Sequence, residues 1–524
     1  MKQFYFKIIV FSVLLSLCTS LQAQYFEIGG ICYAFYVSGD IEGDAVCVES
    51  LQNGRKYSGN VVIPQKINYG GSSYVVAMID QSSFEECTNL KSIKIPNTVT
   101  EIRDNAFQGC SGLSEVEIPN SVLRLGTSTF ENCTGLSIVE IGSGITDIPN
   151  YTFSGCVSLR NIVIPQNVIT ISNDAFNGCP IESITLSCPV IGKFCKGNTF
   201  LKELVMNEGV TEIENKAFEG CTSLESVSFP NSMQKIKDYA FSGCKGLTSL
   251  SFGNSSINMG TSAFQNCVSL KRLDTGSGVA SIGNNAFKDC ISLESVNIGE
   301  GCKKVYRAFP GCTSLRDVYI PKTVKTLTCS FDGCNVETLT LDLPKISKWF
   351  QQNNNFRNLV LGNNVVEIEN GAFWGCRNME SVIIGDCVTT IGENAFVHCE
   401  GLKHITFGKS VESVGYMTVG YSDFETVTSL NLTPPHIYEN ATTFKEDVYK
   451  SAVLYVPSES LEKYKTAIGW KKFWNIEGIN AANGIVQKKN EDKRDKTIYD
   501  LNGRILHIKT KGIYITNGKK VIIK

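Results

Sequence analysis

Cysteine is the residue in this chain whose type and spacing could do the most chemistry. Thirteen of the 21 cysteines close the motif Phe-x-x-Cys. Such a series could be a disulfide framework or could supply nucleophilic thiols. We expect free, buried thiols instead, because the number is odd, equivalent positions of a repeat stack in one column, and pairing neighbours would break their equivalence. The motif begins at Phe84, Phe107, Phe130, Phe153, Phe176, Phe218, Phe241, Phe264, Phe287, Phe309, Phe331, Phe373 and Phe396.

The cysteines outside this series are less regular. Cys32 and Cys47 flank the turn-rich segment "YAFYVSGDIEGDA", which is consistent with a β-hairpin. A disulfide between these two residues therefore stays open as an alternative to two free thiols. The others have no readable partner: Cys188, Cys195, Cys302, Cys329 and Cys387.

The other residue types form no catalytic constellation. The four histidines (His398, His404, His436 and His507) are scattered and make no metal-ligand motif such as H-E-x-x-H. The chain has no G-x-S-x-G motif and no phosphate-binding loop. We therefore expect no enzyme activity, no cofactor and no metal. Charge is nearly balanced, with 49 basic and 51 acidic residues, so nucleic acid is not an expected partner.

The cysteines recur because the whole chain repeats. Their spacing is 23 residues in most turns, and each of two gaps of 42 contains one degenerate turn with Phe194 or Phe350 in the phenylalanine position. Between one motif and the next lies a short strand, as in "LKSIKIP", where Ile93 and Ile95 alternate with polar residues. Pro96 ends this strand, because proline cannot donate a ladder hydrogen bond.

A strand of three or four residues cannot bury a core alone, but it can do so when stacked in parallel on its neighbours. The period therefore predicts an α/β repeat solenoid. "LKSIKI" matches the general leucine-rich repeat signature Leu-x-x-Leu-x-Leu. We expect about 15–16 turns with a parallel β-sheet on one face, and phenylalanine rings filling the interior at about 1.5–3 kcal/mol each.

A solenoid needs a cap at each end, and the flanking segments fit this role. Residues 24–60 alternate in polarity and predict a β-hairpin cap, followed by the solenoid over 61–432. Residues 433–478 predict a strand–helix cap with aromatic side chains, for which an aromatic binding site is the alternative. Residues 479–496 are polar and predict a linker, and 497–524 carry two Asn-Gly turns typical of a small β module.

The first residues have the features of a targeting segment. Lys2 and Lys7 precede a short apolar run, and Ala23 stands before a predicted cleavage site, so 1–23 is interpreted as a signal peptide. A lipid anchor on Cys18 is the alternative, although Leu17 is bulky for that motif. No other long apolar stretch exists, so the mature protein is expected to be exported and not to span a membrane.

The turn "IPNTVTEIRDNAFQGCSGLSEVEIP" resembles those of the BspA-type leucine-rich repeat proteins of bacterial surfaces, over about residues 60–475. This resemblance implies a secreted or surface-exposed protein that binds host matrix proteins or microbial surface proteins. The last stretch, "YDLNGR…KGIYITNGKKVIIK", is similar to C-terminal sorting tails of the type IX secretion system. That similarity implies passage to the outer surface of a Gram-negative bacterium.

Outward-facing strand positions are the expected binding surface. One such column contains Tyr319, Val360 and Ile383, which are not polar and cluster towards one end, and these are our candidate protein-binding residues. The simpler interpretation is that β-branched residues suit strands. Glycan binding and a structural surface-coat role remain alternative functions, and the sequence identifies no specific ligand.

Overall fold

The computed structural model describes residues 25–38, 41–328, 331–437 and 443–479, together with four short strands between 498 and 523. The chain divides into two compact units, Met1–Cys195 and Lys196–Lys524, and each is described by itself. The predicted signal peptide and linker, Cys18, Cys329, His507 and both Asn-Gly turns lie outside the described residues. None of the helices among the described residues is long and apolar enough to cross a membrane.

Unit 1 begins with antiparallel strands that cover the first turn, as predicted. Strands β1, β2 and β3 form an antiparallel meander, β6 pairs in parallel with β3, and β5 pairs with β6 as a hairpin. Both Cys32 and Cys47 are free thiols. Cys32 pairs with Glu49 across the two strands, and Cys47 pairs with Ala34. Cys32 and Cys47 are therefore diagonal neighbours, which are too far apart for a disulfide, so the disulfide alternative is wrong. The strands are β1 (Phe26–Ile28), β2 (Ile31–Ser38), β3 (Ile41–Glu49), β5 (Lys66–Tyr69) and β6 (Ser72–Ile79).

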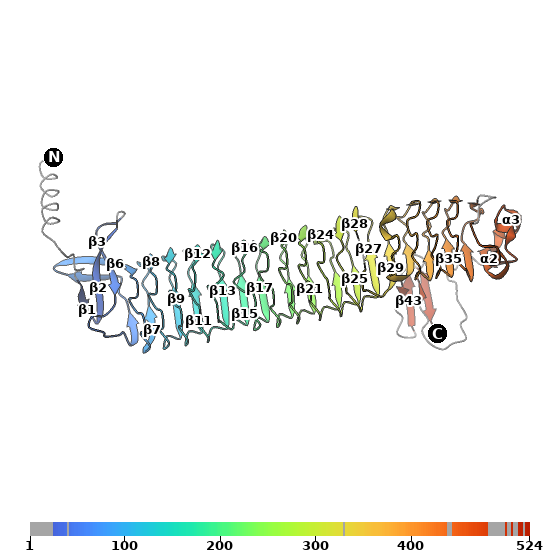
Figure 1. Cartoon of the computed structure of the whole chain (residues 1–524). Helices are drawn as coiled ribbons and strands as arrows, with labels where there is room; N and C mark the ends of the chain where they lie inside the picture. The colour runs from blue at the N-terminus through green and yellow to red at the C-terminus, as the bar shows by residue number, and fades with distance from the viewer. Residues whose placement is uncertain are drawn as a thin grey trace, which may run out of the picture. The chain divides into compact units, whose positions relative to one another are not determined.

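The repeat strands of unit 1 are short and parallel, and successive strands lie side by side (Figure 1). Their register advances by one repeat, so that Val139 pairs with Val116. Apolar residues alternate with exposed ones along them, for instance in β9 and β13. These strands are β4 (Gly59–Val62), β7 (Leu90–Lys94), β9 (Glu115–Ile118), β11 (Ile138–Ile141), β13 (Asn161–Ile164) and β15 (Ser183–Leu186).

A second ladder of mostly two-residue strands runs along another side of the coil, which the sequence did not lead us to expect. In unit 1 its strands carry the last apolar residue of each repeat, such as Ile102, and follow a buried residue such as Val99. The unit 1 members are β8 (Glu101–Ile102), β10 (Arg124–Leu125), β12 (Asp147–Ile148), β14 (Thr170–Ile171) and β16 (Val190–Ile191).

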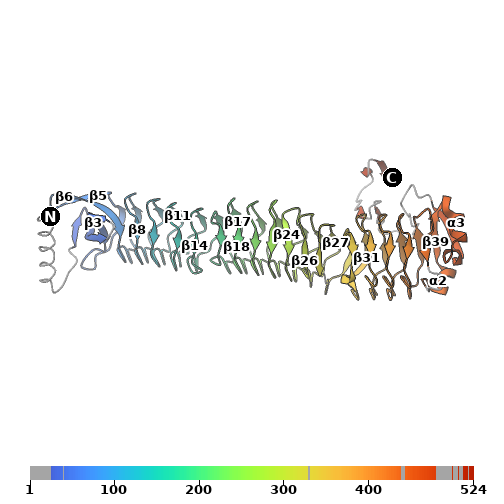
Figure 2. The same ribbon diagram turned by 90° about the horizontal axis from the view of Figure 1, so that it is seen from above.

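Unit 2 repeats the arrangement with longer sheets (Figure 2). Ten of its strands, β23 to β40, form one continuous sheet. The main strands are β17 (Glu203–Met206), β19 (Ser226–Ser228), β21 (Ser249–Ser251), β23 (Arg272–Asp274), β25 (Ser295–Asn297), β27 (Asp317–Ile320), β29 (Val336–Leu341), β31 (Phe356–Leu361), β33 (Ser381–Ile383), β35 (His404–Phe407), β37 (Thr426–Ser429), β39 (Val453–Pro457) and β40 (Asn475–Ile479).

The second ladder of unit 2 falls into two runs, β18 to β28 and β30 to β38. Its strands are β18 (Glu212–Ile213), β20 (Lys235–Ile236), β22 (Ile257–Met259), β24 (Val279–Ile282), β26 (Lys304–Tyr306), β28 (Thr326–Thr328), β30 (Lys345–Ile346), β32 (Glu367–Ile368), β34 (Thr390–Ile391), β36 (Ser413–Val414) and β38 (His436–Ile437). At the chain end, β41 (Ile498–Tyr499) pairs with β42 (Ile505–Leu506) and β43 (Gly512–Thr516) pairs with β44 (Lys519–Ile523), both antiparallel.

The phenylalanine rings stack along the interior of each unit. In unit 1 Phe107 and Phe130 lie 5.1 Å apart with planes 4° from parallel, and in unit 2 Phe241 and Phe264 lie 5.2 Å apart at 2°. Offset stacking of this kind adds to the burial of each ring. Phe194 and Phe350 are buried and contact the neighbouring rings, which confirms that the degenerate turns keep the phenylalanine position.

Unit 2 ends in a cap of strands and short helices (Figure 2). Tyr464 and Trp470 are fully buried in it, and Trp470 Nε1 donates to the carbonyl of Pro435 at 2.8 Å. The predicted apolar helix is only one turn and a half long, so Ile468 and Trp474 lie outside it and are 51% and 76% exposed. The helices are η1 (Lys348–Phe350), α2 (Glu446–Ser451), η2 (Ser458–Ser460), α3 (Leu461–Thr466) and η3 (Trp470–Lys472).

Both units are therefore parallel β-solenoids with a period of about 23 residues and few helices. They supply about 17 turns in all, slightly more than the sequence count. Tight turns occupy the side of the coil that carries the Phe-x-x-Cys motif. The core thus sits between two strand ladders and a wall of turns.

Candidate functional site

The cysteines of the Phe-x-x-Cys column have a structural role. Every Phe-x-x-Cys thiol is free and buried, as predicted. Most donate a hydrogen bond to the carbonyl of the phenylalanine one turn earlier, for example Cys267 Sγ to Phe241 O at 3.4 Å. Burial raises the pKa of the Cys290 thiol to about 12, and that of Cys267 well above its usual value. Such thiols are poor nucleophiles, because the reactive species is the thiolate.

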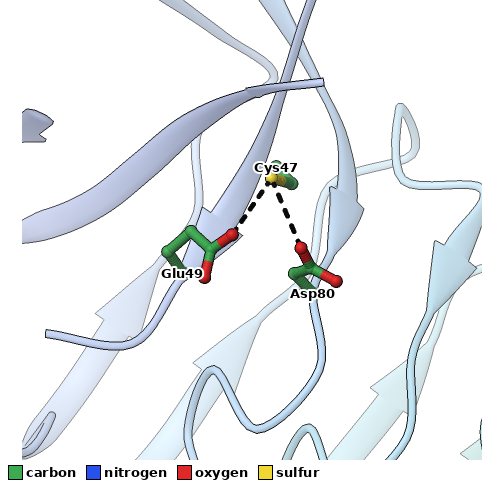
Figure 3. A group of neighbouring side chains, drawn as sticks. All are labelled: Cys47, Glu49 and Asp80. Carbon is green, nitrogen blue, oxygen red and sulfur yellow. Dashed lines mark hydrogen bonds between the residues drawn. The ribbon is translucent and has the colours of Figure 1, made fainter. Parts of the chain in front are cut away.

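A cluster in the N-terminal cap has a different character (Figure 3). Cys47 Sγ donates towards Glu49 Oε1 at 3.5 Å and lies 3.9 Å from Asp80 Oδ2. Burial, followed by a hydrogen bond with Asp80 and the charge of Asp80, raises the pKa of Glu49 to about 7. Arg103 pairs with Asp80 at 2.9 Å on the other side. At neutral pH the carboxyl of Glu49 is therefore close to its titration midpoint.

These three groups lie close enough to hold a metal ion, since one ligand atom from each falls within 4.8 Å of the others. Burial and the two neighbouring carboxylates raise the pKa of Cys47 to about 12, so the thiol keeps its proton. The arrangement is that of a shared-proton cluster held by Arg103. Sequence analysis missed it, because Asp80 is 33 residues from Cys47 and reaches it only through the pairing of β3 with β6.

The predicted binding residues lie in one row of unit 2. Tyr319, Thr340, Val360 and Ile383 are paired in register across four adjacent strands. Tyr319 and Ile383 are half-buried, and the Tyr319 hydroxyl donates to Asp342 Oδ2 at 3.5 Å. Val360 is 1% exposed, so its expected exposure is wrong. Alternation predicts an outward side chain there, but the end of β31 does not alternate in burial, because its last three residues are all buried.

Among the repeat strands, strongly exposed apolar side chains lie mainly in unit 1, where Val62 in β4 is 63% exposed. Ile138 in β11 is 53% exposed and Val163 in β13 is 58% exposed. Exposed carboxylates stand beside them: Glu140 follows Ile138 on the same face of β11, and Glu115 and Glu117 lie on the preceding strand. Val163 was not among the predicted binding residues, although the alternation along its strand places it outward.

A third feature is a group of aromatic side chains on the turn side of unit 2. The rings of His398 and Tyr421 stack at 4.5 Å and 12°, and Trp374 meets His398 edge-on at 6.1 Å. They border a depression of about 380 Å³. His398 and Tyr421 are one period of 23 residues apart, so the repeat places them in one column, and Trp374 belongs to the turn before them; the sequence predictions did not include this group. The other described histidines are elsewhere: His404 contacts Thr426 in the main sheet at 2.9 Å, and His436 lies in the second ladder.

Repeated parallel strands, a stacked phenylalanine core and capped ends define a leucine-rich repeat solenoid. A family described as BspA type leucine rich repeat region (6 copies) matches residues 77–195, 189–309 and 305–424. These matches span more than half of the chain, and the chain belongs to this family. No curated protein matches it.

Several solved structures are similar to this chain. One is a leucine-rich repeat protein from Bacteroides ovatus, at 25% identity and TM-score 0.40, covering 76% of this chain and 98% of that one. Another is a leucine rich cell surface protein from Faecalibacterium prausnitzii, at 22% identity and TM-score 0.32, covering 73% and 94%. A third is the pneumococcal vaccine antigen PcpA, at 15% identity and TM-score 0.29, covering 87% and 99%.

Proposed function

We propose that this chain is an exported surface protein that binds other proteins, as an adhesin for host matrix proteins or microbial surface proteins. Membership of the BspA-type family supports this function, as does the sequence of residues 1–23. The similarity of 497–524 to type IX sorting tails adds display on the outer surface of a Gram-negative bacterium. A stacked sheet offers a rigid face on which successive turns present side chains in rows.

The observation that carries the proposal is the exposed face of β11 and β13. Aliphatic side chains that are more than half exposed on a strand surface gain free energy when a partner covers them. Three exposed carboxylates, Glu115, Glu117 and Glu140, surround them in unit 1. The complementary partner is a protein surface with an apolar centre and basic groups at its edge. Charge pairs of this kind mainly accelerate association and weaken with salt.

The direct test is binding of the purified protein to a panel of immobilised matrix proteins at low and high salt. The double substitution Ile138→Ser with Val163→Ser should weaken saturable binding about tenfold, since removing one interface side chain commonly costs about 1 kcal/mol. Ile169→Ser is the matched control, because Ile169 is 67% exposed but precedes β14 in the second ladder. Equal loss in the control and the double variant would remove β11 and β13 from the interface.

Tyr319 and Ile383 provide a second test within unit 2. If they contribute to an interface, Tyr319→Ser with Ile383→Ser weakens binding independently of the unit 1 variant. Val360→Ser is not informative about binding, because Val360 is buried and its substitution would disturb packing. Absence of binding to every matrix protein, together with self-assembly of the purified protein, would favour a structural surface-coat role instead.

Export has its own test. Antibody labelling of intact cells should detect the full-length chain, and deletion of 497–524 should abolish surface labelling while the protein accumulates inside the cell. Unchanged labelling after the deletion would contradict the sorting role of the tail. Substitution of Cys18 by Ser distinguishes a lipid anchor from cleavage after Ala23, since only the anchor requires the thiol.

A further inference from the structure

The aromatic group on the turn side of unit 2 is built from three consecutive turns. Trp374 precedes β33, His398 precedes β35 and Tyr421 precedes β37. The His398 and Tyr421 rings are close to parallel, and Trp374 stands edge-on to His398. Tyr421 is 49% exposed, while Trp374 and His398 are half-buried. The result is a step-like aromatic surface with an accessible ring at one end.

Two of these aromatic residues have a backbone conformation that is unfavourable for residues with large side chains. His398 has φ = 57° and Tyr421 has φ = 72°, in the left-handed region. The position is the one before the motif cysteine, whose place Ser422 takes in the turn of Tyr421, and in the other turns it is Gly, Asn, Asp, Glu or Gln. Gly375 occupies it in the preceding turn with φ = 75°. Glycine would be unstrained here, and large side chains are uncommon in this region, although Tyr151 and Tyr239 at another position of the turn also adopt it.

Polar side chains surround the rings in the same depression. Gln351, Glu393 and Lys348 line it and are exposed. Gln351 is held in place because its Nε2 donates to the carbonyl of Gly371 at 2.8 Å, and the Glu393 N–H donates to Asn370 Oδ1 at 2.9 Å. The site therefore combines aromatic rings with a fixed amide and with exposed carboxylate and ammonium groups, within a volume typical of small-ligand pockets.

We propose that this depression binds carbohydrate, specifically neutral hexopyranose units of a glycan chain. A pyranose ring has an apolar face of C–H groups and a rim of hydroxyls that both donate and accept. The aromatic faces can pack against the C–H face of the sugar, and Gln351, Glu393 and Lys348 can hydrogen-bond to its hydroxyls. Because the three aromatic residues come from consecutive turns, a short oligosaccharide can lie along them. This activity is separate from the protein-binding face of β11 and β13, and it does not depend on that proposal.

Two other ligand classes fit less well. A quaternary ammonium group needs rings arranged as a cage around it, whereas these rings form a step, and Lys348 in the wall would repel a cation. An apolar peptide would cover the charged side chains of Glu393 and Lys348 without offering them hydrogen-bond partners, which costs free energy. A neutral polyhydroxylated ligand satisfies these groups and the ring faces together.

The test uses the full chain and a panel of immobilised neutral oligosaccharides of glucose, galactose, mannose and N-acetylglucosamine. Saturable binding to at least one member, displaced by the same free sugar, is expected. Tyr421→Gly and His398→Gly should each weaken that binding at least tenfold. Because glycine is unstrained at these φ values, both variants should keep the fold, which thermal unfolding verifies. Trp374→Gln tests the third ring without a change at a left-handed position.

Tyr151→Gly is the matched control. Tyr151 also has positive φ (58°) and is 42% exposed, but it lies in unit 1. Its substitution should leave sugar affinity unchanged. Binding to no member of the panel would overturn the proposal. So would binding that Tyr421→Gly, His398→Gly and Trp374→Gln leave intact, because the sugar would then be held elsewhere.

Discussion

The thiol of Cys133 donates a hydrogen bond to the carbonyl oxygen of Phe107 across one turn of the solenoid, at 3.1 Å. The same pair recurs along both units, as in Cys156 with Phe130 and Cys399 with Phe373. Each bond joins a turn to the one before it, inside a core where the phenylalanine rings already stack. The repeat therefore gains contacts between neighbouring turns in addition to those of the strand ladders, and such contacts dominate the stability of repeat proteins.

We expect Cys133→Ala to reduce the stability of its turn by about 1–2 kcal/mol, from a small cavity and a lost hydrogen bond. Cys133→Ser keeps a donor and should cost less. Hydrogen exchange of the amides in this and the adjacent turns is the measurement, because long repeat arrays need not unfold in one step. Equal costs for Ala and Ser would mean that the hydrogen bond contributes nothing.

Thiol reactivity should separate one cysteine from the column. Among the cysteines that the structure describes, Cys387 is exposed and the others are buried. In the native protein a thiol reagent should therefore label Cys387 quickly and the Phe-x-x-Cys residues only after denaturation, since burial blocks access to them and, at Cys221 and Cys290, also raises the thiol pKa. Mass spectrometry of the labelled peptides reads this out. Rapid native labelling at Cys244 or Cys267 would contradict a closed core.

The N-terminal cap should become less stable as pH rises through neutrality. The carboxyl pKa of Glu49 is about 7 in the folded protein and near 4.5 when unfolded, so between these values only the folded state holds the proton. Its contribution is complete below pH 4.5 and is lost as pH rises through 7. Because solvent still reaches this side chain, we expect a loss of about 1–2 kcal/mol.

Glu49→Gln should remove this dependence, because the amide stays neutral at every pH. The measurement is the pH profile of hydrogen-exchange protection in β3 and β6, compared between the two proteins from pH 5 to 8. Titrating groups far from Glu49 act equally on both proteins and cancel, whereas Asp80, Cys47 and Arg103 interact with Glu49 and belong to the effect that the substitution removes. A difference between the two profiles that is constant with pH would contradict a raised pKa at Glu49.

The fold follows from the sequence to the extent that it depends on repetition. The phenylalanine and cysteine positions represented by Phe107 and Cys110 recur in most turns. Their burial and stacking could therefore be predicted from the period and the apolar character alone. The second ladder was missed, because two-residue strands leave too little alternation to recognise. The cap helix was predicted too long, since the apolar spacing extends to Ile468 although Ala467 is already extended.

The candidate sites are harder to predict from the sequence, because they depend on the positions at which one turn differs from the next. Val360 looks like any outward strand residue until its neighbours in register are known. His398 and Tyr421 occupy a position where most turns have a small or polar residue, and that exception is visible in the sequence. The structural meaning of this exception is not visible in the sequence, because the left-handed backbone and the stacking of the two rings exist only in the folded coil.

Close approach of successive turns leads to a last prediction, at Gly299. A Cβ added there would lie 1.7 Å from the carbonyl oxygen of Gly276, one turn earlier, and 2.4 Å from its carbon. Backbone atoms cannot yield without separating the two turns, so Gly299→Ala should cost about 1–3 kcal/mol, as overpacking does elsewhere. Gly192→Ala is the control, since its nearest neighbour would be 3.8 Å away and alanine should be neutral or slightly stabilising. Hydrogen exchange in β23 and β25 measures the effect, and equal protection in both variants would show that the turns can separate at no cost.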